Sequence, residues 1–462
     1  MSARLIIICL DGADGRMLDQ YSSDGSLPNL SALRLRGATR LLAAPLGSTD
    51  DALWASFQYM VPADEHGRYH YLIPQEGGQI GMSHENERLP ALWDALSRQG
   101  MQVAVLDVPK CRAPGPMNGI QIVDWLTHGE YFASPRSFPA SLADEVLREF
   151  GVRPPHECGY LEIDIDRRDP GHISAKLLTE ISMKCSAGVH YLNSRNWDLF
   201  CIGFSQLHCL HHKFWSFDRT PAIDDLRACD ETTFQVLRAI DQAVGTLIAS
   251  AGSSADRLVL APTDFERNGS LDHLMPEVVA RINRRLLRKF RRCDWLDRSF
   301  RALSKVFLKR PPDSWPCAIL PYAENFLALR VAARGADELY RSASSALPDE
   351  ALLGAIEREF LDLRDDVSGT RLISAIARPS RVGQGRAARN LPDLLIQYPS
   401  GHFPSAVRSD GIGRVAKQSP SYRKGNHRDG GFVLASGARC NALLPEVQTI
   451  ADIGSLAEQV LA

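Results

Sequence analysis

The sequence of 462 residues lacks the features that mark membrane, disulfide-rich and nucleic-acid-binding proteins. No apolar run approaches the roughly 20 residues that a membrane-spanning helix requires, and the opening run Leu5–Leu10 is too short for a signal peptide. The ten cysteines form no Cys-x-x-Cys pair, which favours reduced thiols in the core. A net charge of −2, from 53 basic and 55 acidic residues, gives no electrostatic reason to expect nucleic-acid binding. We therefore expect a cytoplasmic protein without a transmembrane segment.

What the sequence does contain is an alternation of short apolar runs with longer helical patterns. This alternation is typical of an α/β protein with a mostly parallel sheet and helices on both faces. The apolar content of 44% and the charged content of 23% are ordinary for a globular chain with a large core. The expected strands are Leu5–Leu10, Val103–Leu106, Leu199–Phe204, Leu258–Ala261, Leu394–Gln397 and Phe432–Ala435, and the expected helices are Leu89–Gln99, Ser141–Phe150, Ile173–Asn193, Asp225–Ser250 and Asp349–Leu363.

One basic region differs from the rest of the chain. Between Arg281 and Arg310 the only acidic residues are Asp294 and Asp297, and apolar residues recur at roughly helical spacing. We expect a helical insertion over residues 275–325 whose apolar face packs on a core. The alternative is a basic lid over an anionic substrate, or a patch that binds a membrane surface or a partner.

The segment most informative about function follows the strand that ends at Phe204. His208 and His212 come directly after it, and their spacing of four residues places both imidazoles on one face of a helical turn. The carboxyl ends of strands are where ligands and metals collect in α/β proteins. Three more residues stand near strand ends far away in the sequence: Asp11, Asp264 and His427. Each alone is most simply a structural residue, but together they predict a metal site.

A hydroxyl-bearing segment precedes a further helical pattern. Ser48 and Thr49 come just before Asp50, and either hydroxyl would serve as an ordinary helix N-cap. The alternative is a nucleophile at a helix N-terminus, where backbone N–H groups favour an anion.

The order of these residues resembles the alkaline phosphatase superfamily, specifically its type I phosphodiesterase/nucleotide pyrophosphatase branch. The resemblance covers nearly the whole chain and includes Leu27-Pro28-Asn29-Leu30, Leu92-Trp93-Asp94-Ala95-Leu96 and Pro392-Asp393-Leu394-Leu395. It implies one domain over residues 1–462, with a three-layer core, a mostly parallel central sheet, helices on both faces and the basic insertion within it. Members of the family use two zinc-type ions and a Thr or Ser nucleophile to hydrolyse phosphate or related esters.

The resemblance assigns roles to individual residues. Asp11 matches the first carboxylate ligand, Asp264 another carboxylate ligand, and His212 and His427 match two imidazole ligands. Thr49 is the best match for the nucleophile, with Ser48 and Asp50 as alternatives.

Two positions depart from the family pattern. His208 stands where an Asp is expected, and Phe265 stands where a His is expected. The first site thereby becomes three imidazoles from His208, His212 and His427, a set that suits zinc with an open coordination position. The second site keeps Asp11 and Asp264, an oxygen set suited to magnesium or manganese, or it is left vacant. His273, a little downstream, is a candidate for the missing nitrogen ligand.

The expected function is therefore metal-dependent hydrolysis of a small anionic ester, a phosphodiester or a phosphomonoester. The attacking group would be Thr49 or, if the second site holds no ion, metal-bound hydroxide. Two alternatives remain open: a degenerate member that binds a phosphorylated ligand without turnover, and a three-His iron or manganese enzyme with different chemistry.

Overall fold

The computed structural model shows that the chain divides into two compact units. Unit 1 comprises Met1–His66, His84–Arg267 and Ser421–Ala462, and unit 2 comprises Gly67–Ser83 and Asn268–Pro420. The structure describes residues 3–45, 47–74, 80–82, 89–127, 132, 134–154, 170–215, 231–293, 315–321, 325–331, 350–399, 401–418 and 423–462.

Unit 1 is built on one eight-stranded sheet, in the order β2-β19-β9-β1-β8-β5-β6-β7. Its centre is parallel: β1 pairs with β8 and β9, and β5 pairs with β8 and β6. The antiparallel pairs lie towards the two edges: β19 runs antiparallel to β9 and β2, and β7 runs antiparallel to β6. The mostly parallel sheet predicted from the sequence is confirmed. The strands are β1 (Ala3–Leu10), β2 (Ala38–Leu42), β5 (Val103–Leu106), β6 (Gly119–Val123), β7 (Arg136–Phe138), β8 (Trp197–Phe204), β9 (Asp256–Ala261) and β19 (Gly431–Ser436).

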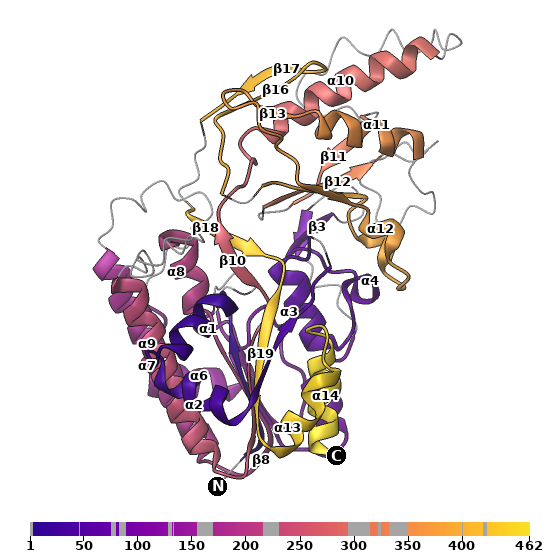
Figure 1. The fold of residues 1–462 in the computed structure, drawn as a ribbon. Coiled ribbons are helices and arrows are strands. Elements are labelled where there is room, and N and C mark those ends of the chain that lie inside the picture. Colours follow the sequence, from indigo (N-terminus) through magenta and orange to yellow (C-terminus); the bar gives the residue numbers. More distant parts are fainter. Residues whose placement is uncertain are drawn as a thin grey trace. The chain divides into compact units, whose positions relative to one another are not determined.

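Helices cover both faces of this sheet, which gives the three predicted layers (Figure 1). Successive side chains of a strand point to opposite faces, so Ile6 and Ile8 of β1 join one core cluster while Leu5 and Ile7 join the other. The first cluster includes residues of α1 (Gly15–Ser23), α2 (Pro28–Arg36), α6 (Ser141–Phe150), α7 (Pro170–Leu192), α8 (Gln206–Phe214) and α9 (Glu231–Ala251). The second includes residues of α3 (Asp50–Tyr59), α5 (Leu92–Arg98), α13 (Ala438–Leu443), η7 (Leu444–Glu446) and α14 (Asp452–Leu461).

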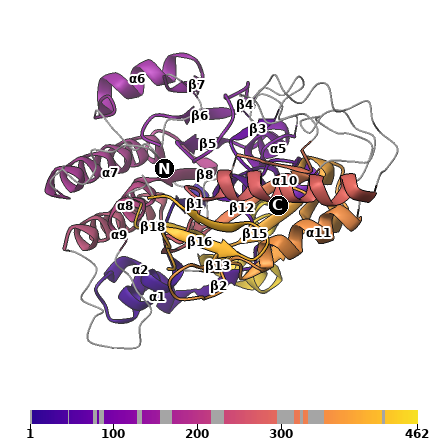
Figure 2. The same cartoon turned by 90° about the horizontal axis from the view of Figure 1, so that it is seen from above.

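Unit 2 has its own sheets and its own core. Its four-stranded antiparallel sheet has the order β11-β12-β15-β14. The predicted strand Leu394–Gln397 is β15 and therefore lies in this sheet. Helices α10 and α11 lie side by side in unit 2 (Figure 2). The elements are β11 (Cys317–Ile319), β12 (Phe326–Val331), β14 (Ala375–Ala377), β15 (Leu394–Gln397), β13 (Arg364–Asp365), β16 (Ala406–Ser409), β17 (Gly413–Ala416), β3 (Leu72–Pro74), β4 (Ile80–Met82), α10 (Met275–Cys293), α11 (Glu350–Leu361), α12 (Pro379–Val382) and η6 (Ala388–Asn390).

The basic region of the sequence begins on α10. The apolar side of this helix, including Val278, Ile282 and Leu286, is buried in the core of unit 2. Residues 294–314 lie outside the described residues. That residues 275–325 form a cap over the site stays a prediction. No helix in the described ranges is long and apolar enough to cross a membrane.

Candidate metal centre

The candidate site forms where β1 and β8 end in unit 1. The backbone N–H of Asp11 donates to the carbonyl of Phe204 over 2.8 Å, so the two strand ends are held together. Gly12 follows with a φ of 76°, and a Cβ there would lie 2.4 Å from the Cα of His208. Only glycine therefore allows α8 to begin so close to the end of β1. As the spacing predicted, α8 carries His208 and His212 one turn apart.

A short antiparallel pair of strands brings the third imidazole to this helix. Strand β10 (Asp264–Arg267) pairs with β18 (Gly425–Arg428), and Phe265 lies opposite His427. The carbonyl oxygen of Gly425 lies 2.9 Å from Nδ1 of His212, which ties β18 to α8.

The three imidazoles form a compact, nearly equilateral group. The ring centroids of His208 and His212 are 4.7 Å apart, those of His208 and His427 are 4.7 Å apart, and those of His212 and His427 are 4.9 Å apart. One ring nitrogen from each lies within 4.8 Å of the other two. All three residues are at most 3% exposed. The structure thus brings together the three residues that the sequence proposed for the zinc site.

Each of these rings has a polar partner at Nδ1. In His208, Nδ1 lies 3.3 Å from Oδ2 of Asp11. In His212, Nδ1 donates to the carbonyl of Gly425, and in His427, Nδ1 lies 3.1 Å from the hydroxyl oxygen of Thr263. Partners of this kind set the tautomer and the orientation of metal-binding histidines. In His212 and His427 they leave Nε2 as the nitrogen suited to a shared ion.

Burial keeps two of these rings in the form that binds metals. It lowers the pKa of His427 to about 3, and it lowers the pKa of His212 well below the ordinary value, with Arg423 adding to the effect. These two imidazoles are therefore neutral at pH 7, with a lone pair available for a cation. The Nε2 atom of His427 is buried and has no hydrogen-bond partner among the described residues. A buried nitrogen without a hydrogen-bond partner is suited to coordinate a metal ion.

A second acidic group lies beside the imidazoles. Asp11, Asp50 and His208 offer ligand atoms within 4.8 Å of one another. Oδ2 of Asp50 lies 3.3 Å from the Lys110 ammonium and 3.8 Å from Nε2 of His427. Although burial raises the pKa of Asp50, Lys110 and the neighbouring imidazoles outweigh that effect and hold it below the ordinary value. Asp50 is therefore a carboxylate at pH 7.

The predicted nucleophile lies at the start of helix α3. Thr49 is its N-cap, and the hydroxyl oxygen accepts the N–H of Ala52 over 3.0 Å. The side chain is buried and directly precedes Asp50. Ser48 instead donates its hydroxyl to the carbonyl of Pro45. The N-cap role foreseen for this segment is thus seen in the structure, and the nucleophile role of Thr49 stays a prediction.

The structure does not bring Asp264 into either group of ligands within the described residues. Its carboxylate accepts the backbone N–H of Gly15 over 2.9 Å, and burial together with Asp14 raises its pKa to about 6. The reason is the alternation of β10. Phe265 points at the imidazoles, with its ring centroid 4.4 Å from that of His427, so its neighbour Asp264 points to the opposite side. His273, the other candidate ligand, lies in unit 2 near the carbonyl of Pro404.

Two residues near the site escaped the sequence analysis. Lys110 follows strand β5 at the same edge of the sheet, so the strand-end argument used for Asp11 would have found it. His211 is adjacent to a predicted ligand, but its Nδ1 donates to the carbonyl of Gly12 over 2.7 Å. Burial lowers the pKa of His211 to about 4.

This shift predicts a measurable pH dependence of stability. Between the ordinary pKa of 6.5 and about 4, the unfolded chain binds a proton at His211 that the folded chain does not. The neutral ring therefore contributes to the free energy of unfolding above pH 6.5, and this contribution is lost as the pH falls. At pH 5 the loss is about 2 kcal/mol. We expect His211→Gln to reduce the fall in unfolding free energy between pH 7 and pH 5 by about that amount. Urea unfolding in the presence of a chelator measures the unfolding free energies of both proteins. An equal fall between pH 7 and pH 5 in the wild type and in His211→Gln would contradict the prediction.

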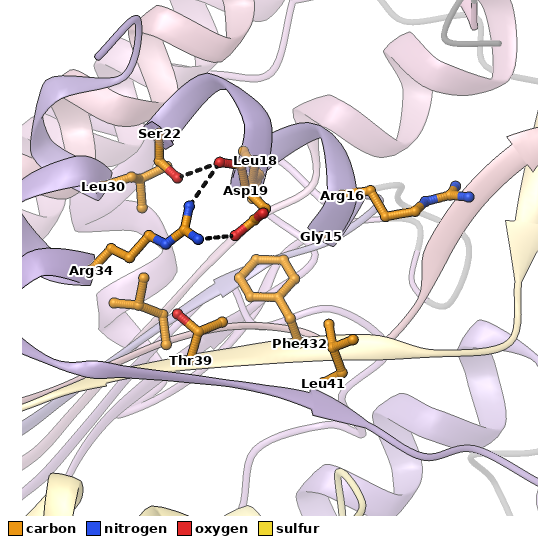
Figure 3. A pocket seen from close by; sticks show the side chains of 11 residues that line it. Gly15, Arg16, Leu18, Asp19, Ser22, Leu30, Arg34, Thr39, Leu41 and Phe432 are labelled. Carbon is orange, nitrogen blue, oxygen red and sulfur yellow. Dashed lines mark hydrogen bonds and ion pairs between the residues drawn. The ribbon is translucent and has the colours of Figure 1, made fainter. Parts of the chain in front are cut away.

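A separate pocket of about 380 Å³ lies between α1, α2 and the strands β2 and β19 (Figure 3). Its one marked ion pair joins Arg34 to Asp19 over 2.8 Å, so these charges neutralise each other. Much of the remaining wall is apolar, including Leu18, Leu41 and Phe432. The imidazole group offers the stronger chemistry, and we take it as the candidate site.

Comparison with known proteins agrees with this architecture. A phosphonoacetate hydrolase from Sinorhizobium meliloti, solved with phosphonoacetate, has a TM-score of 0.57 at 13% identity, covering 99% of this chain and 96% of that chain. Murine ectonucleotide pyrophosphatase/phosphodiesterase 5, solved in complex with AMP, has a TM-score of 0.51 at 10% identity, covering 99% of this chain and 95% of that chain. At such identities the likeness shows the fold.

The sequence comparison identifies the family. No curated protein matches the chain. Residues 5–260, more than half of the chain, match the sequence profile of type I phosphodiesterases/nucleotide pyrophosphatases. The family expected from the order of the sequence motifs is confirmed, and the chain belongs to the type I phosphodiesterase/nucleotide pyrophosphatase family.

Proposed function

We propose that the protein is a metal-dependent hydrolase of a phosphate-type ester. Membership in a family of phosphodiesterases supports the class of reaction. The observation that carries the metal dependence is the arrangement of His208, His212 and His427. Each ring has a partner at Nδ1, and one nitrogen of each ring converges on a common point.

The residues present fit one divalent ion, most simply zinc. Three buried imidazoles are a common ligand set for catalytic zinc, with one coordination position left open. Such an ion, when bound, supplies a Lewis acid for a phosphoryl oxygen and lowers the pKa of a bound water. The second site proposed from the sequence fits less well, because Asp264 is engaged by Gly15.

The surrounding residues prepare this site. Asp11 accepts from Trp54 Nε1 over 3.1 Å and lies beside Nδ1 of His208, so it holds that ring in place. We therefore propose that Asp11 orients His208. Phe265 is fully buried and its ring lines the imidazole group, so it excludes water from that side. Lys110 provides a positive charge that favours an anionic substrate.

For the attacking group we retain Thr49. Its hydroxyl lies at the N-terminus of α3, where backbone N–H groups favour the negative charge that develops on an attacking oxygen. Hydroxide remains the alternative attacking group. Asp50 is one residue further, and its carboxylate is in the acidic group beside the imidazoles.

The substrate class follows from the charges and from the relatives. A phosphodiester or phosphomonoester is the small anion that such a site would bind, and the similar structures contain phosphonoacetate and AMP. We further propose a cytoplasmic location, which the free thiols of buried cysteines such as Cys9 and Cys201 support.

Metal analysis combined with turnover tests this function. We expect purified protein to contain at least one equivalent of a transition metal and to hydrolyse a nitrophenyl phosphate mono- or diester, with both lost in a strong chelator. A protein that retains no metal and has no turnover would instead be a degenerate family member that binds a phosphorylated ligand.

The Thr49→Ala variant identifies the attacking group. If Thr49 attacks phosphorus, turnover of the better nitrophenyl ester falls by at least about a thousandfold while the metal content is unchanged. The matched control is Ser48→Ala, which removes the neighbouring hydroxyl and should retain activity. Turnover that survives in Thr49→Ala would assign the attack to hydroxide.

A further inference from the structure

Lys110 is a buried lysine beside the candidate metal residues. Its side chain is 7% exposed, and its ammonium lies 3.3 Å from Oδ2 of Asp50 and 3.7 Å from Oδ1 of Asp51. A lysine at this depth stays charged only when anions compensate it. Asp50 belongs, with Asp11 and His208, to the group in which a second divalent ion would have to bind.

The backbone holds this lysine in position. The turn that follows β5 has two residues with left-handed backbone conformations, Asp107 at φ 52° and Lys110 at φ 59°. The carboxylate of Asp107 accepts the backbone N–H groups of Trp125 and Leu126 and pairs with Lys184 over 2.8 Å. Strained backbone persists only where its surroundings enforce it, and it often marks functional sites. The position of the ammonium is therefore built into the fold.

The ligand count argues against a second metal ion at the same place. The acidic group offers Asp11, Asp50 and His208, but His208 also belongs to the three-imidazole group. Its Nδ1 lies beside Asp11, so that nitrogen and that carboxylate partner each other. Asp264 is bonded to Gly15, and Phe265 has no ligand atom. A second ion could bind Asp50 only by displacing Lys110 from it.

The charges lead to the same conclusion. Asp50 and Asp51 are buried acids, and the ammonium of Lys110 lies near both of them. A second divalent ion at Asp50 would bring two further positive charges next to this ammonium in a buried site, which is costly.

From these contacts we infer that Lys110 takes the place of a second metal ion, and that the chain binds one divalent ion per molecule. This inference rests on the proposed function, because it presumes that the three imidazoles hold the first ion. It departs from the two-ion arrangement that the sequence resemblance implied.

Counting tight zinc sites tests the inference. Full-length protein freed of metal is titrated with zinc against a competing chelator, and bound metal is measured by elemental analysis. We expect one equivalent for the wild type and for Lys110→Arg, which keeps the charge. We expect two equivalents for Lys110→Met, because Asp50 is then free to bind an ion. Lys176→Met, on α7, is the matched control and should bind one.

The outcomes separate this inference from the proposed function. Two equivalents in the wild type, or one in a folded Lys110→Met variant, would overturn the role of Lys110 while the hydrolase proposal stands. No bound zinc in the wild type would overturn both. If Lys110→Met does not fold, the wild-type stoichiometry decides alone.

Discussion

The His427→Ala variant is expected to lose tight metal binding and ester hydrolysis together. His427 is one of three buried imidazoles whose ring centroids lie 4.7 to 4.9 Å apart, so its removal leaves two nitrogen ligands. Loss of an outer partner of a metal ligand costs about 10–100-fold in affinity, and loss of the ligand itself should cost more. Zinc affinity by chelator competition and turnover of a nitrophenyl ester measure the two effects.

His273→Ala is the matched control for this variant. His273 is a partly buried histidine whose Nε2 lies 3.2 Å from the carbonyl oxygen of Pro404 in unit 2. Its place in the sequence makes it a candidate substitute ligand, but in the structure its Nε2 is engaged by the Pro404 carbonyl. Its removal should leave metal affinity and turnover unchanged. Equal loss in both variants would show that instability, rather than a missing ligand, explains the result for His427.

The grouping of the three imidazoles could be predicted from the sequence. His208 and His212 were paired by helical spacing, and the structure has them on α8. His427 joined them because segments at strand ends meet at one edge of a parallel sheet. These are properties of local periodicity and of topology, which the sequence encodes directly. The mostly parallel sheet and the two helical layers were predictable on the same grounds.

The direction of the Asp264 side chain could not be predicted in this way. Its position after a strand matched the family pattern, but the direction of its side chain depends on which residue of β10 faces the imidazoles. Phe265 takes that direction, so Asp264 meets the start of α1. Strand pairing with β18 decides this alternation, and a long-range pairing of this kind cannot be read from a four-residue segment.

Lys110 and Asp50 show a further difficulty. Lys110 stands near a strand end and Asp50 beside the predicted nucleophile, but nothing in the local sequence pairs the two. They meet because the turn after β5 and the start of α3 both reach the ends of the central strands. Charge compensation across such distances is a property of the folded chain, and here it favours one metal ion over two, both of which the sequence left open.

The Phe265→His variant distinguishes the number of bound ions expected from the family pattern from the number expected from the structure. By family resemblance, a histidine here restores the missing ligand of a second ion, and the protein should then bind two. The structure leads to a different expectation. The Phe265 ring centroid lies 4.4 Å from that of His427 and 5.0 Å from that of His212, so an imidazole in its place would face the first ion.

We therefore expect Phe265→His to bind one zinc ion more tightly, by at least about tenfold, and to hydrolyse esters more slowly by a similar factor. Four protein ligands are typical of closed structural zinc sites, whereas catalytic sites keep one position open. Phe265→Leu is the matched control, because it removes the ring without adding a ligand and should leave zinc affinity unchanged. Chelator competition gives the affinity, elemental analysis gives the stoichiometry, and turnover of a nitrophenyl ester gives the rate. Two equivalents of zinc with faster turnover would contradict the expectation, and would mean that position 265 faces a second ion after all.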